Sequence, residues 1–220
     1  MKKVYLLLIG SFLLAVSSVG FAQESKGAWT ANADFFNRYN WRGSDFGNSP
    51  VVQPTIKYVD GGFSLGAWGS YSLSANTTAT EADLFVGYAF KNGFSLTATD
   101  YYFPAEPGST GRYLDYSNAH ILEISPGYTS GKFSIVGNYA FANANNDIYI
   151  EAALAFKTVN FFVGGGNEMY SADGSFNVVN LGLSTTKTIA VTDKFSLPLI
   201  GKVILNPNKE QIFFVIGFSL

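Results

Sequence analysis

Polar and apolar residues alternate with a period of two along most of this chain. In residues 30–42, one set of positions is polar and the other is mainly apolar and aromatic. The polar set is Thr30, Asn32, Asp34, Arg38, Asn40 and Arg42, interrupted only by Phe36. Residues 52–59, 63–73, 81–90 and 148–156 repeat the alternation. Because successive side chains of a strand point to opposite faces, the pattern predicts strands of about ten residues with one polar and one apolar face.

Short turns flanked by aromatic residues recur five times along the chain. The aromatic residues beside these turns are Tyr58, Phe63, Phe90, Phe94, Tyr128, Phe133, Phe156, Phe161 and Phe195. The other connections are longer and polar, at residues 43–49, 75–80, 105–117, 143–146, 171–174 and 206–209. Short periplasmic turns, longer outer loops and an aromatic girdle are typical of outer-membrane barrels. A soluble β-sandwich also alternates, but it rarely carries so many aromatic residues on the face away from its core.

The pattern predicts an all-β fold, a transmembrane antiparallel up-and-down β-barrel of about twelve strands. The strands begin near Ala28, Val51, Gly62, Glu81, Gly93, Ala119, Lys132, Asp147, Asn160, Phe176, Lys194 and Glu210. Ten strands remain possible if two weak segments are loops. In the last strand, Phe213 and Val215 fall on the otherwise polar, inward set. An even strand number places the start of the first strand and the end of the last strand on the periplasmic side.

Composition narrows the class further. Aromatic residues make up 16% and charged residues 14% of the chain, with 23 glycines. Beyond the first residues no apolar run is long enough for a transmembrane helix, so the chain can span a membrane only as a closed barrel. Cysteine is absent, which excludes disulfides and thiolate metal sites, and we expect no cofactor. The net charge of −2 without a basic run indicates no nucleic-acid partner.

The first 22 residues have the order of a secretory signal peptide. Lys2 and Lys3 precede an apolar core, and Gly20, Phe21 and Ala22 supply a cleavage-like site before a polar stretch. We therefore predict a cleaved signal peptide at residues 1–22 and a single barrel domain at 23–220. The expected location is the bacterial outer membrane. The expected partners are its lipid and, through the apolar last strand, the barrel-assembly machinery.

Four stretches of the first half resemble the TorF-type porin family of conserved bacterial outer-membrane proteins. They are Asn37-Arg38-Tyr39-Asn40-Trp41-Arg42-Gly43, Gln53-Pro54, residues 62–70 and Glu81-Ala82-Asp83-Leu84. Asn40 between Tyr39 and Trp41, and the comparatively short loops, depart from the family pattern. The resemblance implies an outer-membrane barrel that acts as a channel, without indicating its solute.

The charged residues fall almost entirely on the polar face of the predicted strands. Together with Trp68, which lies on the same face, the predicted channel-lining residues are Asp34, Arg38, Arg42, Lys57, Glu81, Asp83, Glu123, Glu151, Glu168 and Lys202. A basic residue facing lipid at mid-depth costs about 2–4 kcal/mol, so these side chains are expected to face the lumen. They either line a pore for small solutes or ions, or pair across the lumen and plug it. The longest loop, residues 105–117, is a candidate to fold inward as a constriction.

Catalysis on lipid is the main alternative function, and it depends on the single histidine. His120 has Ser117 or Ser125 and Asp115 or Glu123 as candidate partners for a hydrolase triad. On a strand, Ser117 lies roughly 10 Å from His120, and no partner follows from the spacing. We therefore expect a channel rather than an enzyme, with no catalytic residue and no metal site.

Overall fold

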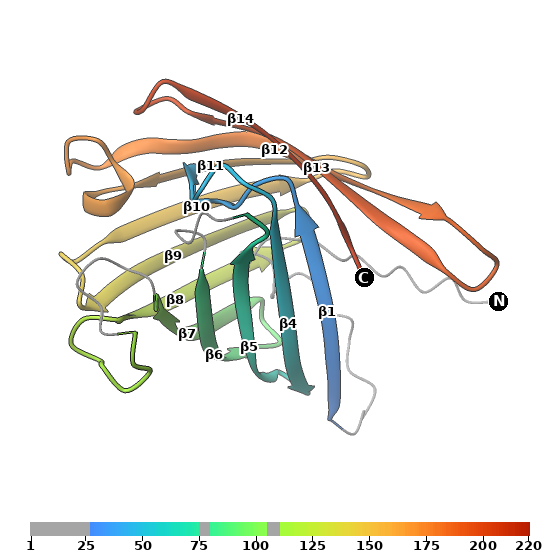
Figure 1. Cartoon of the computed structure of the whole chain (residues 1–220), viewed down its shortest axis with the longest axis horizontal. Helices are drawn as coiled ribbons and strands as arrows, with labels where there is room; N and C mark the ends of the chain where they lie inside the picture. The colour runs from blue at the N-terminus through green and yellow to red at the C-terminus, as the bar shows by residue number, and fades with distance from the viewer. Residues whose placement is uncertain (1–26, 75–79, 105–110) are drawn as a thin grey trace.

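Twelve strands form one closed antiparallel barrel in the part of the chain that the computed structural model describes, residues 27–74, 80–104 and 111–220 (Figure 1). Each strand pairs with its sequence neighbours, and β1 closes the barrel against β14. The twelve strands are β1 (Ala28–Phe36), β4 (Val51–Asp60), β5 (Phe63–Ser72), β6 (Glu81–Ala89), β7 (Phe94–Tyr102), β8 (His120–Ser130), β9 (Phe133–Ala142), β10 (Ile148–Ala155), β11 (Asn160–Gly166), β12 (Asn177–Ala190), β13 (Ser196–Asn206) and β14 (Gln211–Ser219). The prediction of a twelve-stranded barrel is confirmed.

Three predictions from the sequence concern segments that lie wholly or partly outside the residues that the structure describes. The proposed signal peptide, residues 1–22, lies outside the described residues, as do residues 75–79 and 105–110 of two predicted loops. No helix in the described part of the chain is long and apolar enough to cross a lipid bilayer.

The two faces of the barrel wall differ as the alternation predicts. Large apolar side chains such as Trp29, Leu84 and Phe141 are exposed on the outside. The residues of the predicted girdle stand at the turn ends of the strands, where Phe94 contacts Tyr128 with ring centroids 4.8 Å apart. Polar side chains point inward and are buried, among them Gln53, Ser70, Thr99, Asn138 and Asn180.

The first strand is shorter than the alternation suggests. The predicted strand over residues 30–42 is wrong beyond Phe36, where β1 ends and the chain leaves the wall. Residues 37–50 turn inward as a short hairpin, β2 (Asn40–Trp41) and β3 (Ser44–Asp45), which we call the inserted hairpin. Positive φ angles at Arg42 (50°) and Gly43 (82°) make its turn. Polar and apolar residues still alternate through residues 37–42 because the strands of a small hairpin also have two different faces.

Two further expectations are corrected. Glu168 is not at the middle of a strand but begins the 3-10 turn η2 (Glu168–Tyr170), with a left-handed φ of 46°. The described part of the long loop, residues 111–117, is largely exposed outside the barrel, and the inserted hairpin takes the inward place expected for that loop. Phe213 and Val215 do point inward, where they form an apolar cluster with Phe36.

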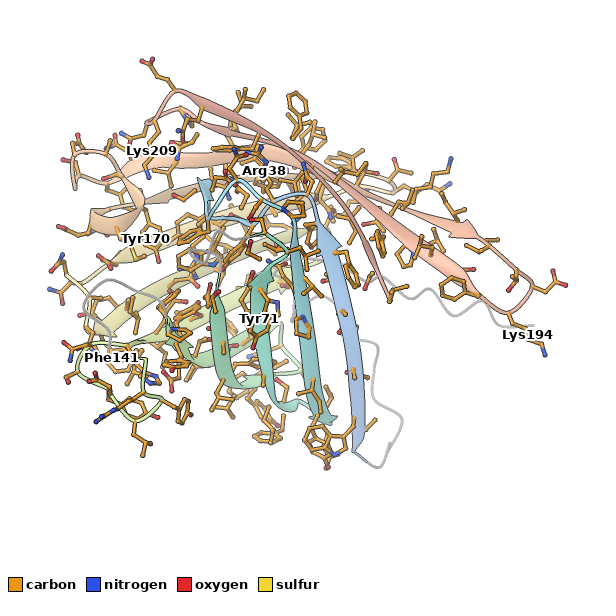
Figure 2. The ribbon with its side chains drawn as sticks, viewed as in Figure 1. Arg38, Tyr71, Phe141, Tyr170, Lys194 and Lys209 are labelled. Carbon is orange, nitrogen blue, oxygen red and sulfur yellow. The ribbon has the colours of Figure 1, made fainter. Side chains whose placement is uncertain are left out.

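The seam between β1 and β14 is the shortest in the barrel. Nine residues of β1 pair with β4, but only Asp34, Phe35 and Phe36 pair with β14. Beyond the seam, β1 and the long β12–β13 hairpin diverge (Figure 1). Lys194 marks the tip of that hairpin, and Lys209 marks the β13–β14 turn at the other end of the ribbon (Figure 2).

Candidate functional site in the barrel lumen

The inserted hairpin packs across the lumen through its aromatic side chains. Tyr39 contacts Trp68 of β5 with ring centroids 5.6 Å apart, and Trp41 contacts Tyr101 of β7 at 5.7 Å. Trp41 also lies 5.7 Å from the ring of Tyr170, in the turn η2. Figure 2 shows Arg38 and Tyr170 toward the Lys209 end of the barrel, so the hairpin occupies that end. These contacts fix the hairpin against the strands β5 and β7 and against the turn η2.

A buried ion pair attaches the tip of the hairpin to the wall. Arg42 donates from Nη1 to Glu123 Oε2 at 2.6 Å and from Nη2 to Oε1 at 2.8 Å. Both side chains are almost inaccessible, with 3% and 2% of their surface exposed. Nη1 also donates to the Tyr170 hydroxyl, at 2.5 Å, and the guanidinium lies 4.3 Å from the ring of Trp41. A bidentate, charge-assisted pair of this kind is among the strongest polar contacts in proteins.

The electrostatics of the pair keep Arg42 charged. Burial lowers the pKa of Arg42, but attraction to Glu123 outweighs it and holds the pKa well above its usual value. Burial raises the pKa of the Tyr170 phenol to about 12, although the positive charge of Arg42 acts in the opposite direction. The tyrosine therefore remains a neutral partner of the guanidinium at neutral pH.

A second polar contact holds the base of the hairpin. The Tyr39 hydroxyl donates to Glu81 Oε2 at 2.7 Å, and both side chains are buried. Burial, followed by the charge of Glu81, raises the pKa of Tyr39 well above its usual value, which keeps the phenol a donor. Within the hairpin, Arg38 donates to Asp45 at 3.3 Å and to Asn48 at 2.8 Å.

Below the hairpin the lumen holds a cavity of about 620 Å³, which extends to the turns near Gly131 and Lys157. Ten residues predicted to line a channel border it: Asp34, Arg38, Arg42, Lys57, Trp68, Glu81, Asp83, Glu123, Glu151 and Lys202. Glu168, in η2, does not. The lining carries both signs of charge, with carboxylates and basic groups facing the same space.

Several residues of the site are not predicted from the sequence. Tyr149 donates to Glu151 at 2.5 Å, and Asn180 donates to the same carboxylate at 2.8 Å. A Cβ on Gly164 would lie only 2.1 Å from the Tyr149 hydroxyl oxygen. The glycine run on β11 therefore makes room for the ring of Tyr149. Tyrosines at inward positions of several strands were a signal for this network, but alternation alone does not say which tyrosine meets which carboxylate.

His120 lies outside the lumen, beneath the described part of the long loop. Its Nδ1 is 2.7 Å from Asp100 Oδ1, and its Nε2 is 2.6 Å from the backbone carbonyl of Tyr113. The rings of Tyr102 and Tyr116 stack on its two faces, with centroids 4.9 and 4.1 Å away. Both ring nitrogens are therefore occupied by acceptors.

The candidate partners of His120 in a hydrolase triad are not brought together. Ser117 donates to Asp115 at 2.8 Å, in the loop above His120. Ser125 donates to Glu123 at 3.0 Å, on the luminal side of the wall. Among the described residues no group of three or more His, Cys, Asp or Glu side chains is arranged to hold a metal ion.

Comparison of the sequence with protein families and with curated proteins identifies no relative. None of the protein-family models matches the chain, and none of the curated proteins is significantly similar to it in sequence. The lumen and the wall are therefore the features from which a function is inferred.

Proposed function

We propose that this chain is an outer-membrane channel of the porin type, in which small solutes or ions pass through a charged lumen narrowed by the inserted hairpin. The observation that carries this proposal is the cavity of about 620 Å³, which runs from the hairpin to the turns at the other end. Charged side chains of both signs lining a bore set the preference for permeating ions. The inward-folded hairpin is then the constriction of the channel.

The outer wall supports the membrane location. Exposed apolar side chains cover it, including Ile56, Leu96 and Phe161, whereas charged side chains in the strands point mostly inward. A large exposed apolar surface is unfavourable in water and is what a lipid-facing wall requires. Export by a signal peptide at residues 1–22, assembly by the barrel machinery through β14, and membership of the TorF-type porin family belong to the same proposal.

A permanently plugged barrel is the second candidate, and a specific observation favours it. The Arg42–Glu123 pair and the Tyr39–Glu81 bond hold the hairpin across the lumen at two separate points. Breaking a buried ion pair leaves an uncompensated charge and is strongly unfavourable. In this alternative the barrel has a structural role and passes no solute. A lipid hydrolase is less well supported, because both nitrogens of His120 already bond to acceptors.

The membrane location and the permeability are tested separately. Cell fractionation and heat-modifiable gel mobility report on the folded barrel, which we expect in the outer-membrane fraction with a mobility that changes on boiling. Swelling of liposomes that contain the purified barrel reports on solute entry, which we expect for small solutes and not for larger ones. Unchanged mobility and a soluble protein would refute the membrane location. Liposomes that never swell would refute the channel and favour the plugged barrel.

A further inference from the structure

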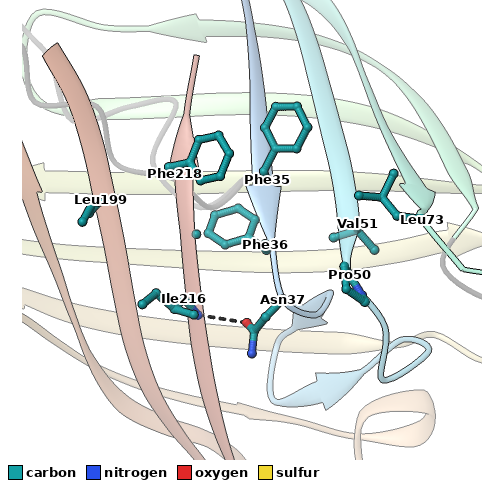
Figure 3. A pocket seen from close by; sticks show the side chains of 10 residues that line it. Phe35, Phe36, Asn37, Pro50, Val51, Leu73, Leu199, Ile216 and Phe218 are labelled. Carbon is teal, nitrogen blue, oxygen red and sulfur yellow. Dashed lines mark hydrogen bonds between the residues drawn. The ribbon is translucent and has the colours of Figure 1, made fainter. Parts of the chain in front are cut away.

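The barrel wall has a notch where β1 leaves it. β1 stops pairing with β14 at Phe36, which lies opposite Gly217. β14 begins six residues before Gly217, at Gln211. The side chain of Asn37 bonds to β14 there in place of a strand. Its Oδ1 accepts from the Ile216 amide at 2.9 Å (Figure 3), and its Nδ2 donates to the Phe214 carbonyl at 3.1 Å.

Beside this contact lies an apolar hollow of about 410 Å³. Phe35 and Phe218 stack at one side, with ring centroids 5.0 Å apart, and Leu199, Ile216 and Leu73 extend the lining (Figure 3). Asn37 supplies the one polar side chain of the lining, and both ends of its amide already bond to β14. The hollow therefore offers a ligand apolar contact.

One aromatic ring separates the hollow from the lumen. Phe36 lines both the hollow and the large cavity below the inserted hairpin. Its ring packs on the bare backbone of Gly217, where a Cβ would lie 2.2 Å from it, and Lys202 Nζ lies 5.3 Å from the ring centroid on the luminal side. At the notch, the side chain of Phe36 thus borders both the apolar hollow and the charged interior.

We propose that the seam hollow binds an acyl chain of a bilayer lipid, with Phe36 as the partition between that chain and the lumen. This inference rests on the proposed membrane location. The hollow is continuous with exposed apolar residues of β14, Phe214 and Ile216, so it opens to the surface that lipid tails cover. A polar solute would lose its hydrogen bonds there without compensation. A strand from another protein would need the backbone groups of β14 that Asn37 already uses.

Photo-crosslinking in vesicles tests the proposal. The purified barrel is reconstituted in phosphatidylcholine that carries a diazirine near the middle of one acyl chain, and the crosslinked peptides are mapped after illumination. Leu199→Trp fills the hollow, where Leu199 is half-buried. Leu84→Trp is the control on the outer face of β6, where Leu84 is exposed. We expect several-fold more crosslinking at the seam than at the β6–β7 wall. Leu199→Trp should abolish the excess, and Leu84→Trp should leave it.

A second variant tests the partition. With Phe36→Ala, crosslinks are expected to reach the luminal residues Asp34 and Lys202, which are protected in the original protein. If this variant does not fold, the comparison of Leu199→Trp with Leu84→Trp still decides whether the hollow binds a lipid chain.

Three other outcomes overturn the inference. Equal crosslinking at the seam and the control wall would show that the hollow has no preference for an acyl chain. Fewer crosslinks at the seam than at the control wall would show that the hollow is covered by something other than lipid, such as a second copy of the chain. Absence of crosslinks from both surfaces would refute the membrane location itself, whereas seam crosslinks without liposome swelling would refute only the channel.

Discussion

Removing the positive charge of Arg42 tests how the inserted hairpin is held. Arg42→Met keeps most of the side-chain length but leaves the buried Glu123 carboxylate without its bidentate partner. Glu123 still accepts from Tyr101 at 2.9 Å and from Ser125 at 3.0 Å, so part of its stabilisation remains. The fraction of molecules whose hairpin is released from the wall should then be far larger than in the original protein.

The structure sets the expected magnitude. Truncating one partner of a buried ion pair costs about 3–5 kcal/mol. The two remaining hydrogen bonds to Glu123 place the expected loss at about 3 kcal/mol, roughly a hundredfold change in the ratio of attached to released hairpin. Arg38→Gln is the matched control, because its pair with Asp45 is more accessible, with 24% and 16% exposure. A pair near the surface contributes only about 0–1 kcal/mol.

A double-mutant cycle with Glu123→Gln provides the assay. Tryptophan emission, to which Trp41 contributes from beside the pair, reports release of the hairpin during urea unfolding of the refolded barrel. Cleavage within residues 37–50 by an added protease reports it independently. We expect the two substitutions to be coupled by at least about 1.5 kcal/mol. Additive single costs, or an effect of Arg42→Met no larger than that of Arg38→Gln, would refute the role of the pair.

Three further predictions concern the other contacts of the site and its rim. Tyr39→Phe leaves the buried Glu81 carboxyl group without this donor and should weaken hairpin attachment by about 1–3 kcal/mol in the same urea titration; an unchanged midpoint would contradict it. His120→Ala should increase proteolysis of residues 111–118 without altering conductance, whereas loss of a lipid-hydrolase activity would support the enzyme. The raised pKa of Tyr170, from 10 to about 12, stabilises the folded protein fully below pH 10, and this stabilisation is lost as the pH rises through about 12. Tyrosinate absorbance and hairpin release should therefore increase together above pH 10, and release that precedes ionisation would exclude this cause.

Most of the barrel was predictable from the sequence because each strand is short and regular. The alternation in residues 81–90 corresponds directly to β6, since Glu81 and Asp83 point inward and Leu84 points outward. The same rule fails at residues 37–42. There the polar and apolar positions still alternate, but the chain has left the wall, and only the left-handed turn at Arg42 and Gly43 distinguishes the two cases.

The inward position of the charges was predictable, but their pairing was not. The cost of a charge in lipid predicts an inward position for both Arg42 and Glu123. Their contact joins residues 81 positions apart, through a hairpin whose inward fold is set by tertiary packing. Glu168 was misplaced for a related reason, because a short 3-10 turn interrupts the connection between β11 and β12.

Single-channel recording in planar bilayers tests the central claim most directly. The purified barrel should give small, discrete conductance steps, and Arg42→Met should give larger or more frequent ones because the hairpin no longer narrows the lumen. Absence of conductance at every voltage in both proteins would contradict a channel. Steps that appear only with Arg42→Met would instead establish a barrel that its own hairpin keeps closed.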